Sequence, residues 1–246
     1  MTEDSIELKI KLERSKKYLQ NADLKSADLS GVNLKGALLA GADLRGANLS
    51  KAFFGDAILA KANLAEANLE EANFNSADMN KVNLKGANMH ALYARLADLR
   101  GSNLSNADIT KANLRQCSMF KVWMRNSDLT GTNLQNVKAA QSQLQESKFC
   151  GAKMEGAELS GARLDGADME GAGLQVANLS RAVLKNTNFK GADLKGANLR
   201  YVVGLTKEQI NSTLIDRKTL LPHYLKIKWI TETEFECHDS EDKPHY

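Results

Sequence analysis

The chain has 246 residues, and its 33 Lys and Arg against 30 Asp and Glu give a formal net charge of +3 at pH 7. This balance excludes strong electrostatic steering toward nucleic acid. The composition is unusual for a packed globular domain: there are 2 Pro and 6% aromatic residues, against 34 Leu, 31 Ala and 21 Asn. A transmembrane helix is excluded because no apolar run approaches 18 residues.

Residues 1–21 are expected to form an N-terminal capping helix. Apolar Ile6, Ile10 and Leu19, with Leu8 and Leu12, stand among charged residues, which favours a helix over about Asp4–Leu19. The start is charged throughout and is not a secretory signal. Three Cys residues support no disulfide framework and fit a reducing compartment, so we expect a cytoplasmic protein without a membrane segment.

Residues 22–200 are a repeat of five residues that keeps its register from Leu24 to Leu199. The 36 central positions carry 23 Leu, 6 Met, 4 Phe, 1 Ile and 2 Ala. The position two residues earlier is Ala in 24 units, and Asp or Asn stands between the two in 22. A period of five fits neither the 3.6 of a helix nor the 2.0 of a strand. We interpret it as a chain that turns a corner every five residues, with two side chains inward and three toward solvent.

This pattern resembles the A(D/N)LXX repeat of the pentapeptide-repeat family, bacterial type, as in Ala22-Asp23-Leu24 and Ala197-Asn198-Leu199. The resemblance implies an all-β solenoid, a right-handed quadrilateral parallel β-helix with four units in each coil. About nine coils at the ~4.8 Å spacing of strands would give a rod about 43 Å long. Such a stack needs protected ends, and we expect short α-helical caps at the N- and C-terminus.

Residues 201–230 are expected to hold the C-terminal capping helix and a packed segment. Thr206-Lys207-Glu208-Gln209 is a capping-box signature, and the helix is expected to reach about Leu214. Tyr224–Ile230 is apolar enough to pack or to form a strand. Residues 231–246 carry six acidic residues, and we expect a disordered tail there.

The candidate partner-binding surface comes from the most irregular stretch of the repeat, Met89–Arg125. There Leu92 and Ala94 exchange the usual sizes of the two inward positions, and aromatic residues replace polar ones outside. Lys81–Arg125 holds eight basic and two acidic residues. Exposed aromatics beside Arg are typical of interface hot spots, whereas a solvated face with scattered aromatics is the other interpretation. The candidate residues are Tyr93, Arg95, Leu96, Arg100, Arg115, Phe120, Lys121, Trp123 and Arg125.

A second apolar cluster comprises Leu38, Phe53 and Ile58 near the N-terminal end. We expect it to receive the N-terminal helix or to form a homodimer contact. The C-terminal end is the other expected route to a homodimer.

No catalytic, cofactor or metal site is expected. The four His residues lack a nucleophile or acid partner, Cys117 occupies an inward position, and Cys150 points outward on another face. Glu236-Cys237-His238-Asp239 could bind a metal only weakly. No GxGxxG, P-loop, HExxH or paired-Cys zinc spacing occurs.

The sequence therefore favours a non-enzymatic scaffold that binds a protein partner. The resemblance also brings in a subgroup that protects DNA gyrase by imitating the negative surface of duplex DNA. The repeats here carry 22 basic and 18 acidic residues, which disfavours that alternative. Weak nucleic-acid binding by Lys81–Arg125 would fall steeply with salt, and we regard a nucleic-acid partner as unlikely.

Overall fold

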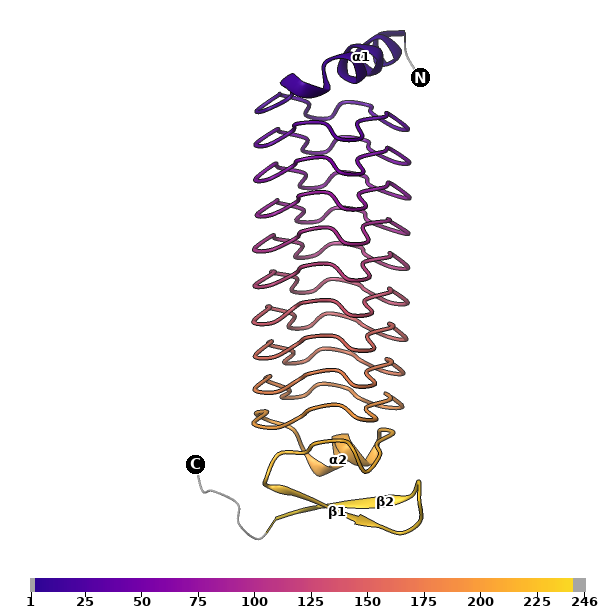
Figure 1. Cartoon of the computed structure of the whole chain (residues 1–246), viewed down its shortest axis with the longest axis vertical. Helices are drawn as coiled ribbons and strands as arrows, with labels where there is room; N and C mark the ends of the chain where they lie inside the picture. The colour runs from indigo at the N-terminus through magenta and orange to yellow at the C-terminus, as the bar shows by residue number, and fades with distance from the viewer. Residues whose placement is uncertain (1–2, 241–246) are drawn as a thin grey trace.

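The structure is a computed structural model that describes residues 3–240. It is a straight rod of stacked coils, with helix α1 (Glu3–Arg14) and the 3-10 turn η1 (Lys16–Tyr18) at one end (Figure 1). Helix α2 (Lys207–Asn211) and the antiparallel hairpin β1 (Leu225–Trp229) and β2 (Phe235–Asp239) lie at the other end. Within the described residues, no helix is long and apolar enough to cross a membrane.

The coils pair through parallel bridges between residues twenty apart. The bridges begin with Asp23 to Asp43 and continue through Val183 to Val203, in four separate columns. Each side of the quadrilateral contributes a single bridge residue rather than an extended strand. Two of the five residues in each unit are used for the turn, so the sides are too short for regular strands.

The corners have a fixed backbone conformation. The second residue after each central residue adopts a positive φ, whether it is Gly31 at 66° or Lys121 at 56°. Asp or Asn on the preceding side supports the turn by accepting the N–H two residues on, as when Arg100 N–H donates to Asp98 Oδ1 at 3.0 Å. Gly is therefore common at the corner but not required.

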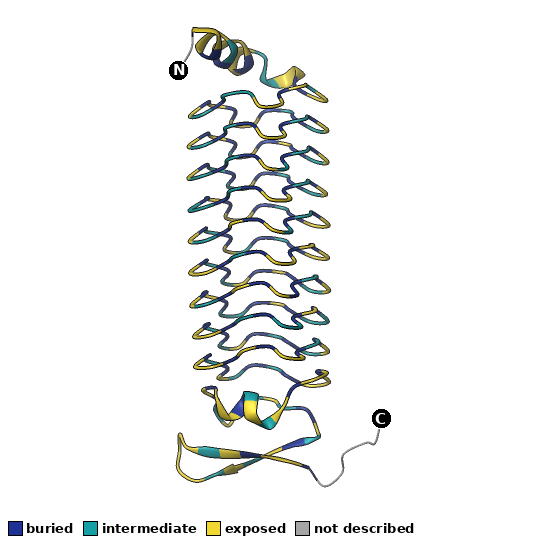
Figure 2. Ribbon diagram, turned by 180° about the vertical axis from the view of Figure 1, so that it is seen from behind, coloured by how far each residue is buried: buried dark blue, intermediate teal, exposed yellow. Residues whose placement is uncertain are grey.

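The interior is a narrow column of the central and small residues, which appears in Figure 2 as regularly placed buried positions along every coil. Leu92 and Ala94 are both fully buried, so their exchange of sizes is accommodated inside the core. Phe54 and Phe74 stack with their ring centroids 4.7 Å apart, one coil from each other. Where Ser or Thr replaces Ala, its hydroxyl donates to a carbonyl 23 residues earlier, as Ser102 does to Met79 at 2.8 Å.

Truncating Phe74 tests how closely this column is packed. We expect Phe74→Ala to lower the free energy of unfolding by about 3–5 kcal/mol, because it leaves a cavity beneath Phe54. Phe74→Leu, the residue found at most central positions, should cost less than half as much. Urea denaturation followed by circular dichroism measures both, and equal losses would contradict the packing argument.

Helix α1 closes the open edge of the first coil with both polar and apolar side chains. Ser5 and Lys9 are buried against the rod, while Ile6 and Ile10 are about half exposed. The helix spans Glu3–Arg14, so it ends before the expected Leu19, and its buried face is mixed: Leu12 is buried and Leu8 packs against the core beside the polar Ser5 and Lys9. The polar residues are needed there because the first coil has backbone groups with no preceding coil to pair with.

These edge groups are paired by residues spaced four apart on α1. Ser5 Oγ donates to Asp28 O at 3.0 Å, and Lys9 Nζ donates to Ser30 O at 2.8 Å. Glu13 Oε1 then accepts the N–H of Asn33 at 2.8 Å. The helix therefore takes the place of a preceding coil.

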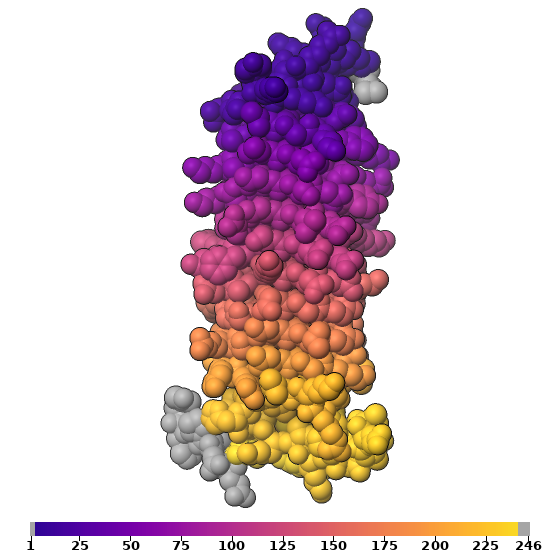
Figure 3. Space-filling view, in the orientation of Figure 1, coloured from indigo at the N-terminus to yellow at the C-terminus, as the bar shows by residue number. Residues whose placement is uncertain are grey.

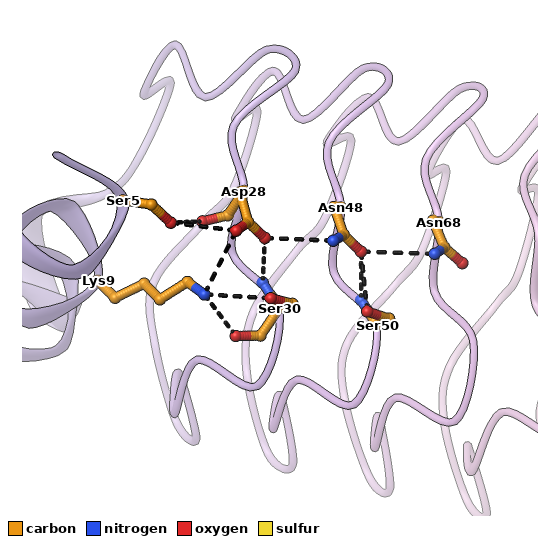
Figure 4. A network of polar contacts seen from close by, with 7 residues as sticks. All are labelled: Ser5, Lys9, Asp28, Ser30, Asn48, Ser50 and Asn68. Carbon is orange, nitrogen blue, oxygen red and sulfur yellow. Dashed lines mark hydrogen bonds and ion pairs between the residues drawn. The ribbon is translucent and has the colours of Figure 1, made fainter. Parts of the chain in front are cut away.

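The same contacts continue into the rod as a ladder of side-chain amides (Figure 4). Asn48 Nδ2 donates to Asp28 Oδ1 at 3.2 Å, and Asn68 Nδ2 donates to Asn48 Oδ1 at 3.4 Å. The Lys9 ammonium lies 3.8 Å from Asp28 Oδ2 at the start of this ladder. The buried Lys9 cation thus has a carboxylate partner at the first member of the ladder, Asp28.

The carboxylate of Asp28 should make this cap sensitive to acid. Hydrogen bonds from the Ser30 hydroxyl and backbone N–H, together with the Lys9 charge, lower the pKa of Asp28. In the unfolded chain an Asp titrates near pH 3.9, so the stabilisation is complete above that pH and is lost as the pH falls through the lower folded pKa. We expect α1 amides to lose protection in this range in the wild type.

Amide hydrogen exchange of α1 between pH 7 and pH 3 measures this loss. Asp28→Asn should weaken protection of α1 already at pH 7 and show little further loss on acidification. Asp108→Asn, on the same side of the rod but far from α1, is the matched control and should retain the wild-type profile. An acid response that persists in Asp28→Asn would contradict the assignment to this carboxylate.

The C-terminal end replaces the regular coil by a helix and two irregular bridges. The capping box predicted at Thr206 is present, with Gln209 as its partner, but α2 ends at Asn211 rather than near Leu214. Leu214 and Leu220 instead bridge to Asp193 and Asn198, so the chain returns to the path of the coil after one short helix. Gln209 Nε2 donates to two carbonyls of the last regular coil, of Leu184 and Thr187, at 3.0 and 2.8 Å.

The expectation of a disordered tail over 231–246 is wrong for its first part. Phe235–Asp239 forms β2, because Phe235 packs against Trp229 and Cys237 is buried with its N–H donating to Asn211 Oδ1 at 2.9 Å. The expected strand in 224–230 is β1. The rest of the predicted tail, residues 241–246, lies outside the described residues.

Candidate interaction surface

The candidate residues must be placed on a rod with four sides. Residues twenty apart share a column, so we name each side by one member: the Trp123 side, the Asp28 side, the Tyr93 side and the Asp98 side, in chain order. The Trp123 and Tyr93 sides are opposite each other, because one side separates them in each direction: the Asp28 side in one and the Asp98 side in the other. Figure 3 shows the colours following the chain in order along the rod, so a surface group gathers residues from neighbouring coils.

The nine predicted residues divide into two groups. Tyr93, Arg95, Leu96 and Arg115 lie on the Tyr93 side and the corner after it. Arg100, Phe120, Lys121, Trp123 and Arg125 lie on the corner after the Asp98 side and around the Trp123 side. The single surface expected from the sequence is therefore two surfaces, because a stretch of 33 residues winds around the rod more than once.

The first group offers exposed apolar area but little organisation. Tyr93 and Leu96 are each about half exposed. Arg95 Nη2 donates weakly to Gln116 Oε1 at 3.4 Å. The Arg115 backbone donates to Asn113 Oδ1 and accepts the N–H of Leu96, whereas its guanidinium forms no ion pair within the described residues.

The second group forms a corner that we call the basic corner, comprising Lys81, Arg100, Phe120 and Lys121. With Asn80 and Gly101, these residues line a shallow hollow. Lys121 Nζ lies 5.0 Å from the centroid of the Phe120 ring, within range of a cation–π contact. Arg100 is held by Asp98 through two hydrogen bonds of its Nε, which raise the pKa of the guanidinium and lower that of Asp98.

Trp123 stands beside this corner with 59% of its surface exposed. Arg125 lies next to it and donates to Gln143 Oε1 at 3.3 Å and to Gln145 Oε1 at 3.2 Å. These amides orient the guanidinium without neutralising it. A second hollow includes Lys121, Trp123, Arg125 and Arg163 in its lining, so the two hollows meet at Lys121.

Gln143, Gln145 and Arg163 were missed by sequence reasoning. The signal that could have found them is the spacing of twenty, which places Gln143 directly below Trp123 and Arg163 below Gln143. They lie outside the irregular stretch Met89–Arg125 and do not form a recognisable linear motif.

The apolar cluster of Leu38, Phe53 and Ile58 does not receive α1, and that interpretation is wrong. The contact of this cluster with the N-terminal segment is the backbone N–H of Leu38, which donates to the carbonyl of Lys16 in η1 at 2.8 Å. Phe53 and Ile58 remain 52% and 40% exposed. The polar residues of α1 instead bond Asp28 and Ser30 on and after the Asp28 side, and Asn33 on the Tyr93 side.

The cysteines are poorly suited to nucleophilic chemistry. Burial raises the pKa of Cys117 to about 12, and its Sγ donates to Ala94 O at 2.8 Å. Burial and then the neighbouring Asp168 carboxylate raise the pKa of Cys150 to about 11. Burial raises that of Cys237 to about 11 as well. Among residues 3–240, no three His, Cys, Asp or Glu side chains are grouped closely enough to hold a metal ion.

Thiol modification checks this assignment. With pKa values of about 11 to 12, almost no thiolate is present at neutral pH, and the thiolate is the reactive form. We expect all three thiols to react slowly with a disulfide reagent in the folded protein at pH 7.5 and rapidly in urea. Rapid reaction of any one thiol in the folded protein would contradict the conclusion that the cysteines are poor nucleophiles.

Comparison with known proteins agrees with the repeat architecture. The family model for pentapeptide repeats matches with eight copies, over residues 18–56, 54–90, 97–136, 142–175 and 164–200, which together make up more than half of the chain. The comparison with curated proteins found no match.

Three solved structures illustrate the likeness. HetL, a pentapeptide repeat protein involved in heterocyst differentiation regulation from the cyanobacterium Nostoc sp. strain PCC 7120, is 28% identical, with 90% of this chain and 93% of HetL covered and a TM-score of 0.47. A pentapeptide repeat protein from the Arabidopsis thaliana thylakoid lumen is 37% identical over 39% of this chain and 68% of its own, with a TM-score of 0.40. QnrB1, a plasmid-mediated fluoroquinolone resistance protein, is 16% identical over 63% of this chain and 83% of its own, with a TM-score of 0.40. By its unbroken five-residue register and the family match over most of its repeats, the chain belongs to the pentapeptide repeat family, whose members fold as right-handed quadrilateral β-helices.

Proposed function

We propose that the protein is a non-enzymatic scaffold that binds a protein partner through the Trp123 side and the basic corner. The observation that carries this proposal is an exposed Trp123 flanked by Lys121 and Arg125, neither of which forms an ion pair within the described residues. Aromatic and Arg side chains of this kind dominate the energy of protein interfaces. The about nine rigid coils inferred from the repeat would hold the surface in one arrangement.

A protein partner is favoured over imitation of DNA or binding of a duplex. The repeats carry 22 basic and 18 acidic residues, so the rod does not present the uniform negative surface of a polyanion. The Asp28 side carries Asp108, Asp128 and Asp168 in one column against a single cation, Lys148, and this excess of carboxylates would repel a nucleic acid wrapped around the rod. The cytoplasm remains the expected location.

A homodimer through the C-terminal end receives less support. The exposed residues of the hairpin are polar: Lys226 lies opposite His238, and Lys228 lies opposite Glu236 across the two strands. A charged outer face is typical of a terminal cap that keeps a repeat protein from stacking end to end.

Photo-crosslinking from the Trp123 side tests the proposal. A photoreactive residue at Asn103, directly above Trp123, should give a discrete adduct with a partner protein in the native cell. The same residue at Asn133, on the opposite side, is the matched control and should give none. Trp123→Ala should abolish the Asn103 adduct without lowering the melting temperature; equal adducts from both sides, or none, would contradict the proposal.

A further inference from the structure

The corner between the Asp98 and Trp123 sides differs chemically from the other three. This corner consists of two columns of outward residues spaced by twenty, one from Ala40 to Arg200 and one from Gly41 to Tyr201. Neither column contains an Asp or Glu in any coil. Each of the other corners has at least two carboxylates, such as Asp56 and Glu155 on the corner after the Tyr93 side. Four successive coils add one cation each to this corner: Lys61, Lys81, Arg100 and Lys121.

Most of these cations are not neutralised by the protein itself. Arg100 is paired with Asp98, but Lys61, Lys81 and Lys121 form no ion pair within residues 3–240, and all three are exposed. Like charges one coil apart repel each other, so this arrangement is unfavourable for the free protein. An anionic partner would relieve the repulsion along the whole row.

The spacing of the row selects among anionic partners. Neighbouring coils are ~4.8 Å apart, whereas an α-helix advances about 5.4 Å per turn. An extended strand repeats on one face only every ~6.8 Å, from its rise of about 3.4 Å per residue. Across the three steps from Lys61 to Lys121, a helix with one carboxylate per turn drifts by only about 2 Å, which flexible Lys and Arg side chains accommodate.

Apolar groups adjoin one end of the row. Phe120 and Trp123 are exposed beside Lys121, and Arg125 is oriented next to them by two amides. Resting on the scaffold function proposed above, we infer that the occupant is an acidic amphipathic helix of a partner protein. Its carboxylates lie along the row at one per turn, and its apolar side chains rest on Phe120 and Trp123.

A designed peptide tests this inference. The probe is a fluorescein-labelled helical peptide with Glu at one position per turn and Leu beside it on the same face. A peptide of the same composition, with Glu at every second residue, is the comparison. Fluorescence anisotropy at 0.1 M salt should show tighter binding of the helical design, and Trp123→Ala should weaken it.

Charge reversal provides the matched control. Lys81→Glu with Lys121→Glu should weaken the dissociation constant by about tenfold or more, since each reversal replaces attraction by repulsion. The control is Lys51→Glu with Lys111→Glu, which changes the net charge equally at the same left-handed position of the diagonally opposite corner. It should change the dissociation constant by less than about twofold.

Three results would overturn the inference: equal binding of both peptides, equal effects of both double variants, or tighter binding of a single-stranded oligonucleotide at the same salt. The Asn103 photo-adduct separates the two proposals. An adduct without peptide binding would leave the scaffold function standing and remove the acidic helix. If neither the Asn103 adduct nor binding of the helical peptide is observed, the scaffold function is removed as well.

Discussion

The backbone hydrogen bonds between residues one coil apart are the interaction on which the whole structure depends. Each coil offers N–H and carbonyl groups to the next, as when Leu104 N–H donates to Trp123 O at 2.6 Å. Because these bonds repeat every twenty residues, one inserted residue would break the register of all later coils. The inward positions must then be small and uniform, which explains why Ala and Leu fill the interior and aromatics are scarce.

The same bonds create a problem at each end, and the two ends solve it differently. At the N-terminus, α1 presents Ser5, Lys9 and Glu13 to the free edge and leaves Ile6 and Ile10 outside. These hydrogen-bond partners are needed there in addition to the apolar contact of Leu12 and Leu8, because an unpaired buried backbone group is costly. At the C-terminus the chain continues the coil through Leu214 and Leu220 and covers it with the hairpin.

The exterior follows different rules from the core. Outward residues need only tolerate the turn, so each of the sides and corners can carry its own chemistry over the length of the rod. The basic corner uses this freedom: cations accumulate in neighbouring coils although they repel one another, and no carboxylate of the same corner compensates them. A surface that costs stability in the free protein is better explained by recognition than by folding.

The sequence by itself determined the repeat, its register and the inward positions, including the Leu92 and Ala94 exchange, because each depends on a period of five visible along the chain. The C-terminal capping box was also predictable, since Thr206 and Gln209 interact locally. Only the tertiary structure decided which outward residues meet. It separated Tyr93 and Arg115 from Trp123, brought Gln143 and Arg163 to Trp123, turned Lys9 inward, and ordered Phe235–Asp239 as a strand. These outcomes depend on contacts between residues about twenty or more apart, which a linear pattern does not encode.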